Sequence, residues 1–550
     1  MGGSPRVRIN AVGRDAAGKR YVDLSILDAR GREFRDVASL AGMTNDPRAL
    51  IEGAANAGIV VMTTPRQRKL LRKIEDALNK VDTTDAVDFE VVSKVGWHGQ
   101  RFVTPHWVYG IQRRKIRAAL AHIKRSNRWC PRGDLGTWQQ MMATAGRGNN
   151  LVIFAACAAF AAPLLSLVRL EGATIVLVGT TRTGKSSLSW LISSVWGGDP
   201  NFKTGYMDSW KATVGSLEEI AAQSRDSLLV LDDTQQLAGG RGSRADTLAE
   251  AIFTLSSGIQ KARLTNEGPI ADWRVIVWAT ANDSMRKILA DGGRRYDDSM
   301  AARMIELSAT RRLGVFDEIP EGFDPASFSK WIVEQSNLHY GEAIDSYLRR
   351  LTLDRRLDED GLVDWVKARM ASQKARLGID GTHGLKDSIG DIFALIYAAG
   401  QLARKYGILP WSAAEIRRAV LDIYASYQSS TAHDSVASDP IAYVRNTIER
   451  LRGEFVELRD LSDGDSDRVT NALGLLGSSR RGEGEFIFLP EQFERTFGGS
   501  FGVDTLLVHL KNAELLKCDK GYQTKRTVAG SRERVYCLDG NILSYGQHSA

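Results

Sequence analysis

The residues from Gly179 to Ser187 have the types and spacing that a phosphate-binding loop requires. The run is Gly179, Thr180, Thr181, Arg182, Thr183, Gly184, Lys185, Ser186 and Ser187, between an apolar strand-like stretch and a helix-like one. It matches the pattern G-x-x-x-x-G-K-[ST], in which backbone N–H groups and the start of the helix face the phosphates. Lys185 would neutralise the β- and γ-phosphates, and the Ser186 hydroxyl would ligate Mg²⁺. The run therefore predicts a site for ATP and Mg²⁺.

Two carboxylates follow a second apolar stretch, residues 228–232. Asp232 ends this stretch and Asp233 comes directly after it. A buried strand would deliver Asp232 to the carboxyl edge of a sheet, where it would bind Mg²⁺ together with Ser186. Asp233 would then orient or activate the water that attacks the γ-phosphate. The alternative is a strand that simply ends in a solvated acidic turn.

These residues need a sheet whose strands end at a common edge, and the middle of the chain predicts one. Short apolar stretches alternate there with helical patterns, at residues 173–179, 228–232, 275–280 and 304–307. Such alternation is typical of a wound α/β fold with helices on both faces of the sheet. The apolar run 151–168 is long enough to span a bilayer, but Pro163 interrupts it. We therefore expect a buried helix against the sheet and no membrane span.

The remaining patterns divide the chain into regions. Residues 1–133 mix strand-like and helix-like stretches, 326–428 are helical throughout, and 429–439 are small and polar, as in a linker. The predicted organisation is an N-terminal α+β accessory region at 1–133, an ATPase core at 134–325, a helical lid at 326–428 and a winged-helix domain at 440–550.

Composition agrees with a soluble globular protein, since 43% of residues are hydrophobic and 25% are charged. The net charge of +7 mildly favours a polyanionic partner. No two of the four cysteines have the C-x-x-C spacing of a zinc site, and a disulfide framework is not indicated either. These features are typical of a reducing compartment, so we expect a cytoplasmic protein.

Taken together, these stretches resemble a family of AAA+ proteins from mobile elements and phages. The family includes the replicative helicases of cassette chromosomes, which are related to MCM-type and superfamily-three hexameric helicases. Further segments that carry the resemblance are Gly96-Trp97-His98-Gly99, Trp210-Lys-Ala-Thr213, Gly258-Ile-Gln-Lys261-Ala-Arg263 and Ala271-Asp272-Trp273. The sequence departs from the family pattern at Asp233, where Glu is usual, and at 279–282, where a Ser-Thr-Gly-Glu-like turn is expected.

The resemblance implies two further groups at the nucleotide. The stretch that ends at Thr280 and Asn282 looks like sensor 1, on a strand between those of the phosphate loop and of Asp232. Either residue could sense the γ-phosphate, and Asn282 could instead cap a turn. Arg303, in the run Met300-Ala-Ala-Arg303, resembles an arginine finger that reaches the nucleotide of a neighbouring subunit. A surface arginine paired with Asp297 or Asp298 is the alternative, and Arg294 and Arg295 are other candidates for the finger.

Two pairs of basic residues are candidates for DNA contacts. Lys261 and Arg263 alternate where related hexameric helicases have a pore hairpin, and both could grip the phosphates of a single strand. A solvated hairpin with two surface cations explains them equally well. Lys525 and Arg526 would lie at the tip of the wing that follows a recognition helix at 502–512, although winged helices also bind proteins. Trp97, Phe102 and Trp107 are expected in a core.

The sequence thus predicts an ATP-dependent DNA helicase or translocase of a mobile element or phage. It would work as a hexameric ring on single-stranded DNA during replication, with duplex DNA at the winged helix and a primase or other replication protein as a partner. One alternative is an AAA+ DNA-binding switch or loader that remodels a partner without unwinding. A second is a P-loop phosphotransferase that acts on a small molecule.

Overall fold

The computed structural model describes most of the chain, and its contacts form two compact units, Met1–Tyr427 and Gln428–Ala550. The described residues are 5–15, 18–59, 61–81, 88–92, 94–110, 115–118, 126–198, 205–234, 244–261, 272–291, 296, 298–438, 440–463, 465–477, 484–497, 503–519 and 521–545.

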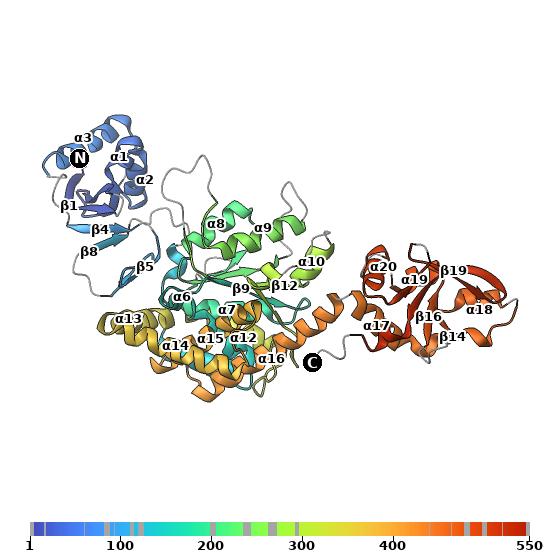
Figure 1. The fold of residues 1–550 in the computed structure, drawn as a ribbon. Helices are drawn as coiled ribbons and strands as arrows, with labels where there is room; N and C mark the ends of the chain where they lie inside the picture. Colours follow the sequence, from blue (N-terminus) through green and yellow to red (C-terminus); the bar gives the residue numbers. More distant parts are fainter. Residues whose placement is uncertain are drawn as a thin grey trace. The chain divides into compact units, whose positions relative to one another are not determined.

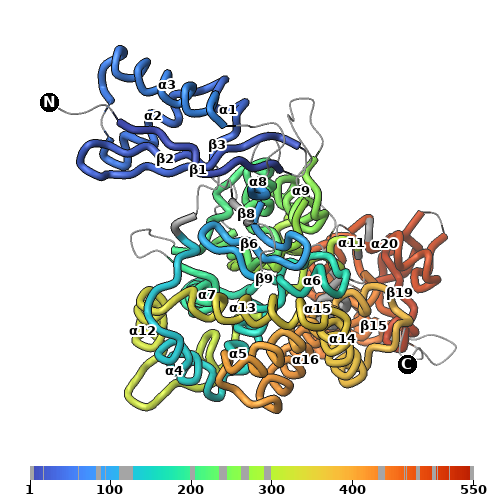
Figure 2. The backbone as a smooth tube through the Cα atoms, turned by 90° about the vertical axis from the view of Figure 1, so that its left-hand side faces the viewer, coloured from blue at the N-terminus to red at the C-terminus, as the bar shows by residue number. Residues whose placement is uncertain are grey.

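The first unit begins with a five-stranded sheet in the order β3-β2-β1-β4-β8. Its strands are β1 (Arg6–Asp15), β2 (Arg20–Leu27), β3 (Glu33–Ser39), β4 (Phe89–Val92) and β8 (Lys115–Ala118). The helices α1 (Leu40–Asn45), α2 (Arg48–Asn56) and α3 (Thr64–Leu78) follow β3. Figure 2 shows α2 and α3 on one face of β1–β3, where their apolar stripes share a core with Val22 and Leu24. The mixture of strands and helices expected at the N-terminus is thus present.

A second, small sheet consists of β5 (Gly96–His98), β6 (Arg101–Val103) and β7 (Val108–Tyr109). Trp97 and Phe102 are buried and belong to the same core as the central helices of the first unit. The Trp97 indole Nε1 donates to the carbonyl of Pro163 at 2.8 Å, and its backbone N–H donates to buried Asp226 at 2.9 Å. The expected core position is confirmed for these two aromatics, but Trp107 is 51% exposed because it lies in the turn between β6 and β7.

The central sheet is entirely parallel, with the order β10-β11-β12-β9-β13. Its strands are β9 (Ala173–Val178), β10 (Asp208–Ser209), β11 (Leu228–Asp232), β12 (Ile276–Ala281) and β13 (Met304–Ser308). Four of them coincide, to within a residue, with the apolar stretches of the sequence. Near-continuous apolar runs are required here because helices cover both faces of a parallel sheet. The predicted α/β class, with a parallel sheet, is confirmed.

Helices cover the two faces of this sheet in separate groups (Figure 1). One face packs against α8 (Val214–Gln223), α9 (Arg244–Ser257) and α10 (Met285–Asp291). The other carries α4 (Leu135–Gly146), α5 (Asn150–Ala159), α6 (Ala162–Val168) and α7 (Lys185–Trp196). Between α10 and β13 lies the short α11 (Asp298–Ala301).

The apolar run 151–168 is buried as predicted, but it forms two helices, α5 and α6, instead of one. The chain turns at Phe160 and Ala161, and Pro163 then occupies the first turn of α6. Proline is tolerated there because the N–H groups of the first turn form no hydrogen bonds within the helix. Within the described residues, no single helix has the length and hydropathy to cross a membrane. The pair α5 and α6 would do so only together, across a bend of 61°.

Five helices complete the first unit and include the predicted helical region. They are α12 (Pro325–Leu338), α13 (Glu342–Leu357), α14 (Glu359–Arg376), α15 (Gly384–Lys405) and α16 (Ala413–Ser438). The apolar helix α15 is buried along most of its length, which explains its sequence. The predicted linker at 429–439 begins next to the boundary between the two units, but it is helical as far as Ser438, because α16 continues across that boundary. Small polar residues do not by themselves end a helix when neither glycine nor proline interrupts them.

The second unit contains α17 (Pro440–Leu451) and a six-stranded sheet with short helices. Its other helices are α18 (Ser466–Asn471), α19 (Pro490–Phe497) and α20 (Val503–Asn512). The strands are β14 (Val456–Glu457), β15 (Leu475–Gly477), β16 (Glu485–Phe488), β17 (Leu516–Lys517), β18 (Thr524–Val528) and β19 (Ser531–Asp539). The segment α20 coincides with the helix expected at 502–512, and β18–β19 is a hairpin that follows it.

Candidate functional site

The phosphate-loop sequence connects β9 to α7. Gly184 is the N-cap of α7 with φ +89°, a conformation that glycine adopts without strain. Glycine has no side chain with which to cap the helix, so the first N–H groups of α7 are left for an anion. The loop is held from behind, since the N–H of Val315 donates to the carbonyl of Thr183 at 2.8 Å. A Cβ on Gly314 would lie 2.4 Å from the same carbonyl oxygen, so only glycine permits this close approach.

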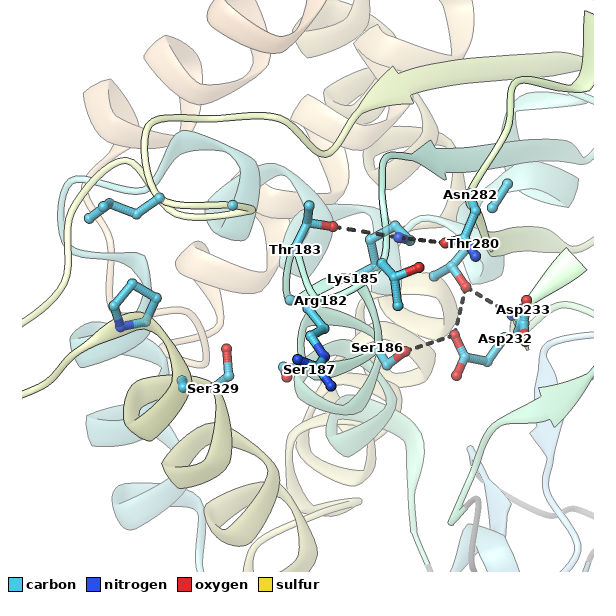
Figure 3. Close-up of a pocket in the computed structure, with 17 residues that line it drawn as sticks. Arg182, Thr183, Lys185, Ser186, Ser187, Asp232, Asp233, Thr280, Asn282 and Ser329 are labelled. Atoms are coloured by element: carbon cyan, nitrogen blue, oxygen red, sulfur yellow. Dashed lines mark hydrogen bonds between the residues drawn. The ribbon is translucent and has the colours of Figure 1, made fainter. Parts of the chain in front are cut away.

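Lys185 lies inside the loop and is 8% exposed. Its Nζ donates to the carbonyls of Gly179 and Thr180 at 2.6 and 2.7 Å. It also donates to Oδ1 of Asn282 at 3.0 Å (Figure 3). Burial lowers the pKa of Lys185, while the charges of Asp232 and Asp233 oppose this shift. The ammonium is therefore fixed at the centre of the loop, at the end of β9.

Asp232, at the end of β11, forms hydrogen bonds with residues that follow β9 and that lie in β12. Its Oδ1 accepts a hydrogen bond from Ser186 Oγ at 3.2 Å and one from Thr280 Oγ1 at 2.6 Å (Figure 3). The strand β12, which carries Thr280, lies between β9 and β11, as expected of the sensor strand. Since all three strands are parallel, their carboxyl ends bring these side chains to one edge of the sheet.

Asp233 leaves β11 with φ +59°, in the left-handed region that aspartate tolerates better than most residues. Its backbone N–H donates to Thr280 Oγ1 at 2.9 Å, so the Thr280 hydroxyl connects both aspartates. Asn282 contacts Lys185 instead. The structure therefore separates the two sensor candidates: Thr280 orients Asp232 and Asp233, whereas Asn282 faces the ammonium.

A cavity of about 770 Å³ opens over these groups. From the predicted site it is lined by Thr181, Arg182, Thr183, Gly184, Lys185, Ser186, Ser187, Asp232, Asp233, Thr280 and Asn282. Gly179 and Thr180 are not in the lining, and they act through their carbonyls on Lys185. The lining also includes Leu313, Gly314, Pro325, Ala326 and Ser329, which sequence reasoning missed. The sequence carried a signal for only one of these positions. Asp324 followed by Pro325 is typical of the start of a helix, and the two residues are the N-cap and first residue of α12.

The donor set agrees with a magnesium nucleotide. Mg²⁺ is usually held by one or two protein oxygens, with phosphate oxygens and water completing the octahedron. Ser186 Oγ and Asp232 Oδ1, 3.2 Å apart, are two such oxygens beside the uncapped start of α7. Bound there, the ion would neutralise phosphate charge. Within the described residues there is no cluster of three His, Cys, Asp or Glu side chains that could hold a metal ion.

Comparisons with known proteins identify a matching domain and a matching fold. A family model, the domain of unknown function DUF927, matches residues 4–274, just under half of the chain. A solved structure entitled "SCCmec type IV Cch - active helicase" aligns over 99% of this chain and 95% of its own, with a TM-score of 0.60 and 17% identity. The chain has the fold of a cassette-chromosome helicase. The resemblance found in the sequence motifs is thereby confirmed.

Other comparisons add less. Two apo structures of the NrS-1 C-terminal region align over 96% of this chain and 95% of theirs, with TM-scores of 0.33 and 0.34 and identities of 9% and 10%. Scores this low do not indicate a shared fold. No curated protein matches the sequence.

Arg303 lies away from the cavity of its own chain. It precedes β13, and its carbonyl accepts from Thr174 N at the start of β9, so it is at the amino edge of the sheet. Its Nη1 donates to the carbonyl of Ser299 at 2.7 Å, and its guanidinium lies 5.5 Å from the ring centroid of Phe253. The side chain is not in the lining of the nucleotide cavity, and its expected role as an arginine finger stays a prediction. Arg294, Arg295 and Asp297 are outside the described residues.

The base of the predicted pore hairpin is visible after α9. Ile259 and Asp272 form an antiparallel bridge, and Trp273 N donates to the carbonyl of Gly258 at 2.8 Å. The Lys261 side chain is 70% exposed and lies 3.6 Å from Glu250, a pair that water screens strongly. Arg263 lies outside the described residues, so its expected position stays a prediction.

The basic pair of the second unit is not at a wing tip. Lys525 and Arg526 lie within β18, opposite Arg534 and Glu533, and the turn of the hairpin comes later, at Ala529 and Gly530. Lys525 is exposed.

The Arg526 side chain folds back onto its own domain, where Nη2 donates to Glu485 Oε2 at 3.2 Å. Burial alone would raise the pKa of Glu485, but hydrogen bonds from Lys517 and Cys537 and the charge of Arg526 lower it. The expected position of Arg526 at a wing tip is therefore wrong, and its guanidinium is paired within its own domain, while its role in binding DNA phosphates stays a prediction.

Proposed function

We propose that the chain is an AAA+ ATPase that works as a DNA helicase or translocase of a mobile element or phage. The observation that carries the proposal is the convergence of the phosphate loop, Asp232, Thr280 and Asn282 on one cavity at the carboxyl edge of a parallel sheet. The order of the strands supports the AAA+ assignment, because β12 lies between the strands of the phosphate loop and of Asp232.

In this proposal each residue has one task at the nucleotide. The loop N–H groups and Lys185 hold the phosphates, and Ser186 and Asp232 hold Mg²⁺. Asn282 senses the γ-phosphate, because it is the sensor candidate that contacts Lys185. Asp233 orients the attacking water, while Arg303 of a neighbouring subunit stabilises the charge of the transition state.

The DNA contacts follow from the hairpin and from the second unit. Subunits would form a ring, most simply a hexamer, with the Lys261 and Arg263 hairpins in its pore along single-stranded DNA. The second unit would be a winged helix that contacts duplex DNA through α20 and Lys525. The fold shared with an active helicase supports this assignment, and a primase or other replication protein would be its partner.

One feature favours a second candidate function, an ATP-dependent switch or loader that does not unwind. Asp233 is one methylene shorter than the glutamate usual at this position, which leaves more distance to an attacking water. Unwinding of a forked duplex by the full chain, with Lys185→Ala as the blank, separates the two. ATP-dependent release of the labelled strand supports the helicase, whereas ATP-dependent DNA binding without strand release supports the switch.

A further inference from the structure

A second cavity, of about 420 Å³, lies within the helical region between α14, α15 and α16. It shares no residue with the nucleotide cavity. Five of its lining residues are cations: Arg369, Arg376, Arg404, Lys405 and Arg417. Its remaining lining residues are aromatic, small or neutral polar, and no carboxylate is among them.

These five cations are not neutralised by ion pairs. No carboxylate in the described part of the chain pairs with any of them, although other residues of α14 and α15 are paired. Arg355 pairs with Glu359, and Lys374 of α14 pairs with Asp391 of α15, both at 2.7 Å. The helices therefore place acids beside basic residues outside the cavity and omit them within it. Like charges gathered in this way repel one another, and a bound anion would relieve that repulsion.

Neutral contacts hold the cationic groups in place. The Arg369 guanidinium and the Lys405 Nζ lie 5.0 and 5.3 Å from the ring centroid of Trp365. Arg404 Nε donates to Gln401 Oε1 at 3.3 Å, and Arg376 donates to Ser372. These contacts orient the side chains while leaving their positive charge uncompensated.

Arg417 adds a second, independent observation. Its Nε is buried and has no hydrogen-bond partner in the structure. A buried donor of a charged group without an acceptor is costly, and an oxygen of a bound anion would satisfy it. The guanidinium groups of arginine match phosphate oxygens in a bidentate geometry.

We propose that this cavity binds successive phosphates of a nucleic-acid strand. Four of the five cations, all except Arg417, are exposed residues, so they can contact a chain that passes over the surface. The wall offers little room for a base, because two cations already cover Trp365. Contacts with phosphates alone would position the strand without reading its sequence. The inference rests on the proposed function in one respect, namely that the strand is the DNA on which the ATPase acts.

The test measures binding of labelled oligothymidylate by the full chain, by fluorescence anisotropy at several salt concentrations without nucleotide. The double variant Arg376→Ala/Arg404→Ala should bind on the order of 10-fold more weakly, with a salt slope lower by about 1.4 for two lost phosphate contacts. The matched control, Lys367→Ala/Arg418→Ala, removes exposed cations of α14 and α16 that do not line the cavity. It should bind as the wild type does, and each single variant should lose about half of the effect.

Other outcomes separate this inference from the proposed function. Wild-type chain that binds DNA and hydrolyses ATP in response to it, with a double variant of unchanged affinity and salt slope, overturns the inference alone. Wild-type chain that binds no DNA contradicts the proposed function. If such a chain binds inorganic tripolyphosphate and loses it in the double variant, the cavity takes a free polyphosphate and the inference is overturned as well.

Discussion

The nucleotide cavity and the basic hairpin of the second unit teach different lessons about placing charged residues from a sequence. At the cavity, Lys185, Asp232 and Thr280 lie roughly fifty residues apart along the chain, yet Asp232 Oδ1 accepts from Thr280 Oγ1 at 2.6 Å, and Lys185 Nζ donates at 3.0 Å to Asn282, two residues after Thr280. In the hairpin, Lys525 and Arg526 are adjacent in sequence, yet one is exposed and the other is paired with Glu485. Parallel strands force their ends to one edge, whereas a hairpin turns every second side chain to the opposite face.

Arg303 offers the largest expected effect and extends the comparison beyond one chain. Arg303→Ala should lower ATP turnover about 10³-fold and leave ATP binding intact, because an arginine finger acts on the transition state. Mixing this variant with Lys185→Ala should restore turnover in steady-state assays. In a mixed assembly, the intact phosphate loop of the Arg303→Ala subunit lies beside the intact Arg303 of the Lys185→Ala subunit. Arg286→Ala is the matched control, as Arg286 stacks on Tyr296 in the way that Arg303 stacks on Phe253. Mixtures no more active than the sum of the two variants would contradict a role in trans.

Substitutions of Thr280 test whether its hydroxyl positions Asp232 and Asp233 at the edge of the sheet. Thr280→Val keeps the shape but removes the donor to Asp232 and the acceptor for Asp233 N–H. We expect kcat for ATP hydrolysis to fall about 10-fold, because a mispositioned group costs rate. Thr280→Ser, which retains the hydroxyl, should remain close to wild type. Equal rates for the valine and serine variants would show that the hydroxyl has no such role.

Asp233 tests one of the two departures from the family pattern, both of which lie at the cavity. Asp233→Glu should raise kcat by about 3- to 10-fold, because the longer side chain carries its carboxylate nearer to the attacking water. Rapid-quench measurement of phosphate formation isolates the hydrolysis step, and Asp233→Asn, which has no base, should slow it. A slower glutamate variant would mean that the left-handed backbone at this position makes aspartate the better residue.

The smallest expected effects are those of substitutions in the basic hairpin, at Lys525 and Arg526. They test directly whether the two adjacent cations have different roles. Arg526→Ala should lower the free energy of unfolding by about 1 kcal/mol, since it leaves the half-buried Glu485 with fewer partners. Lys525→Ala should leave stability within about 0.5 kcal/mol and instead weaken DNA binding. Chemical denaturation and DNA titration of both variants provide the measurement. The opposite assignment of the two effects would restore Arg526 as a DNA contact.

The sequence was sufficient wherever a local pattern fixes the geometry. The phosphate loop, the four apolar strands and the acids after β11 were all predictable, because a strand, a glycine loop and a helix follow one another without a break. The turn containing Gly314 and Val315 was not predictable. It packs against Thr183 from a segment about 130 residues away, and neither periodicity nor a motif connects the two.

The errors also have physical causes. The wing tip was misplaced because Ala529 adopts a left-handed conformation with φ +46° beside Gly530, and alanine gives no sign of such a turn. The linker expected at 429–439 from its polarity lies next to the boundary between the two units, but it is helical as far as Ser438, because one end of the helix is already formed by the rest of α16. Trp107 was expected in a core with Trp97 and Phe102, yet its side chain is exposed because it lies in the turn between β6 and β7.

The central claim is that ATP hydrolysis at this cavity is coupled to DNA. Steady-state ATP hydrolysis with and without single-stranded DNA, using Lys185→Ala as the blank, tests it most directly. We predict strong stimulation by single strands in the wild type, none in Lys185→Ala, and loss of the stimulation with ATP still bound in Lys261→Ala. Turnover that DNA does not change would contradict the motor and favour a switch or a phosphotransferase.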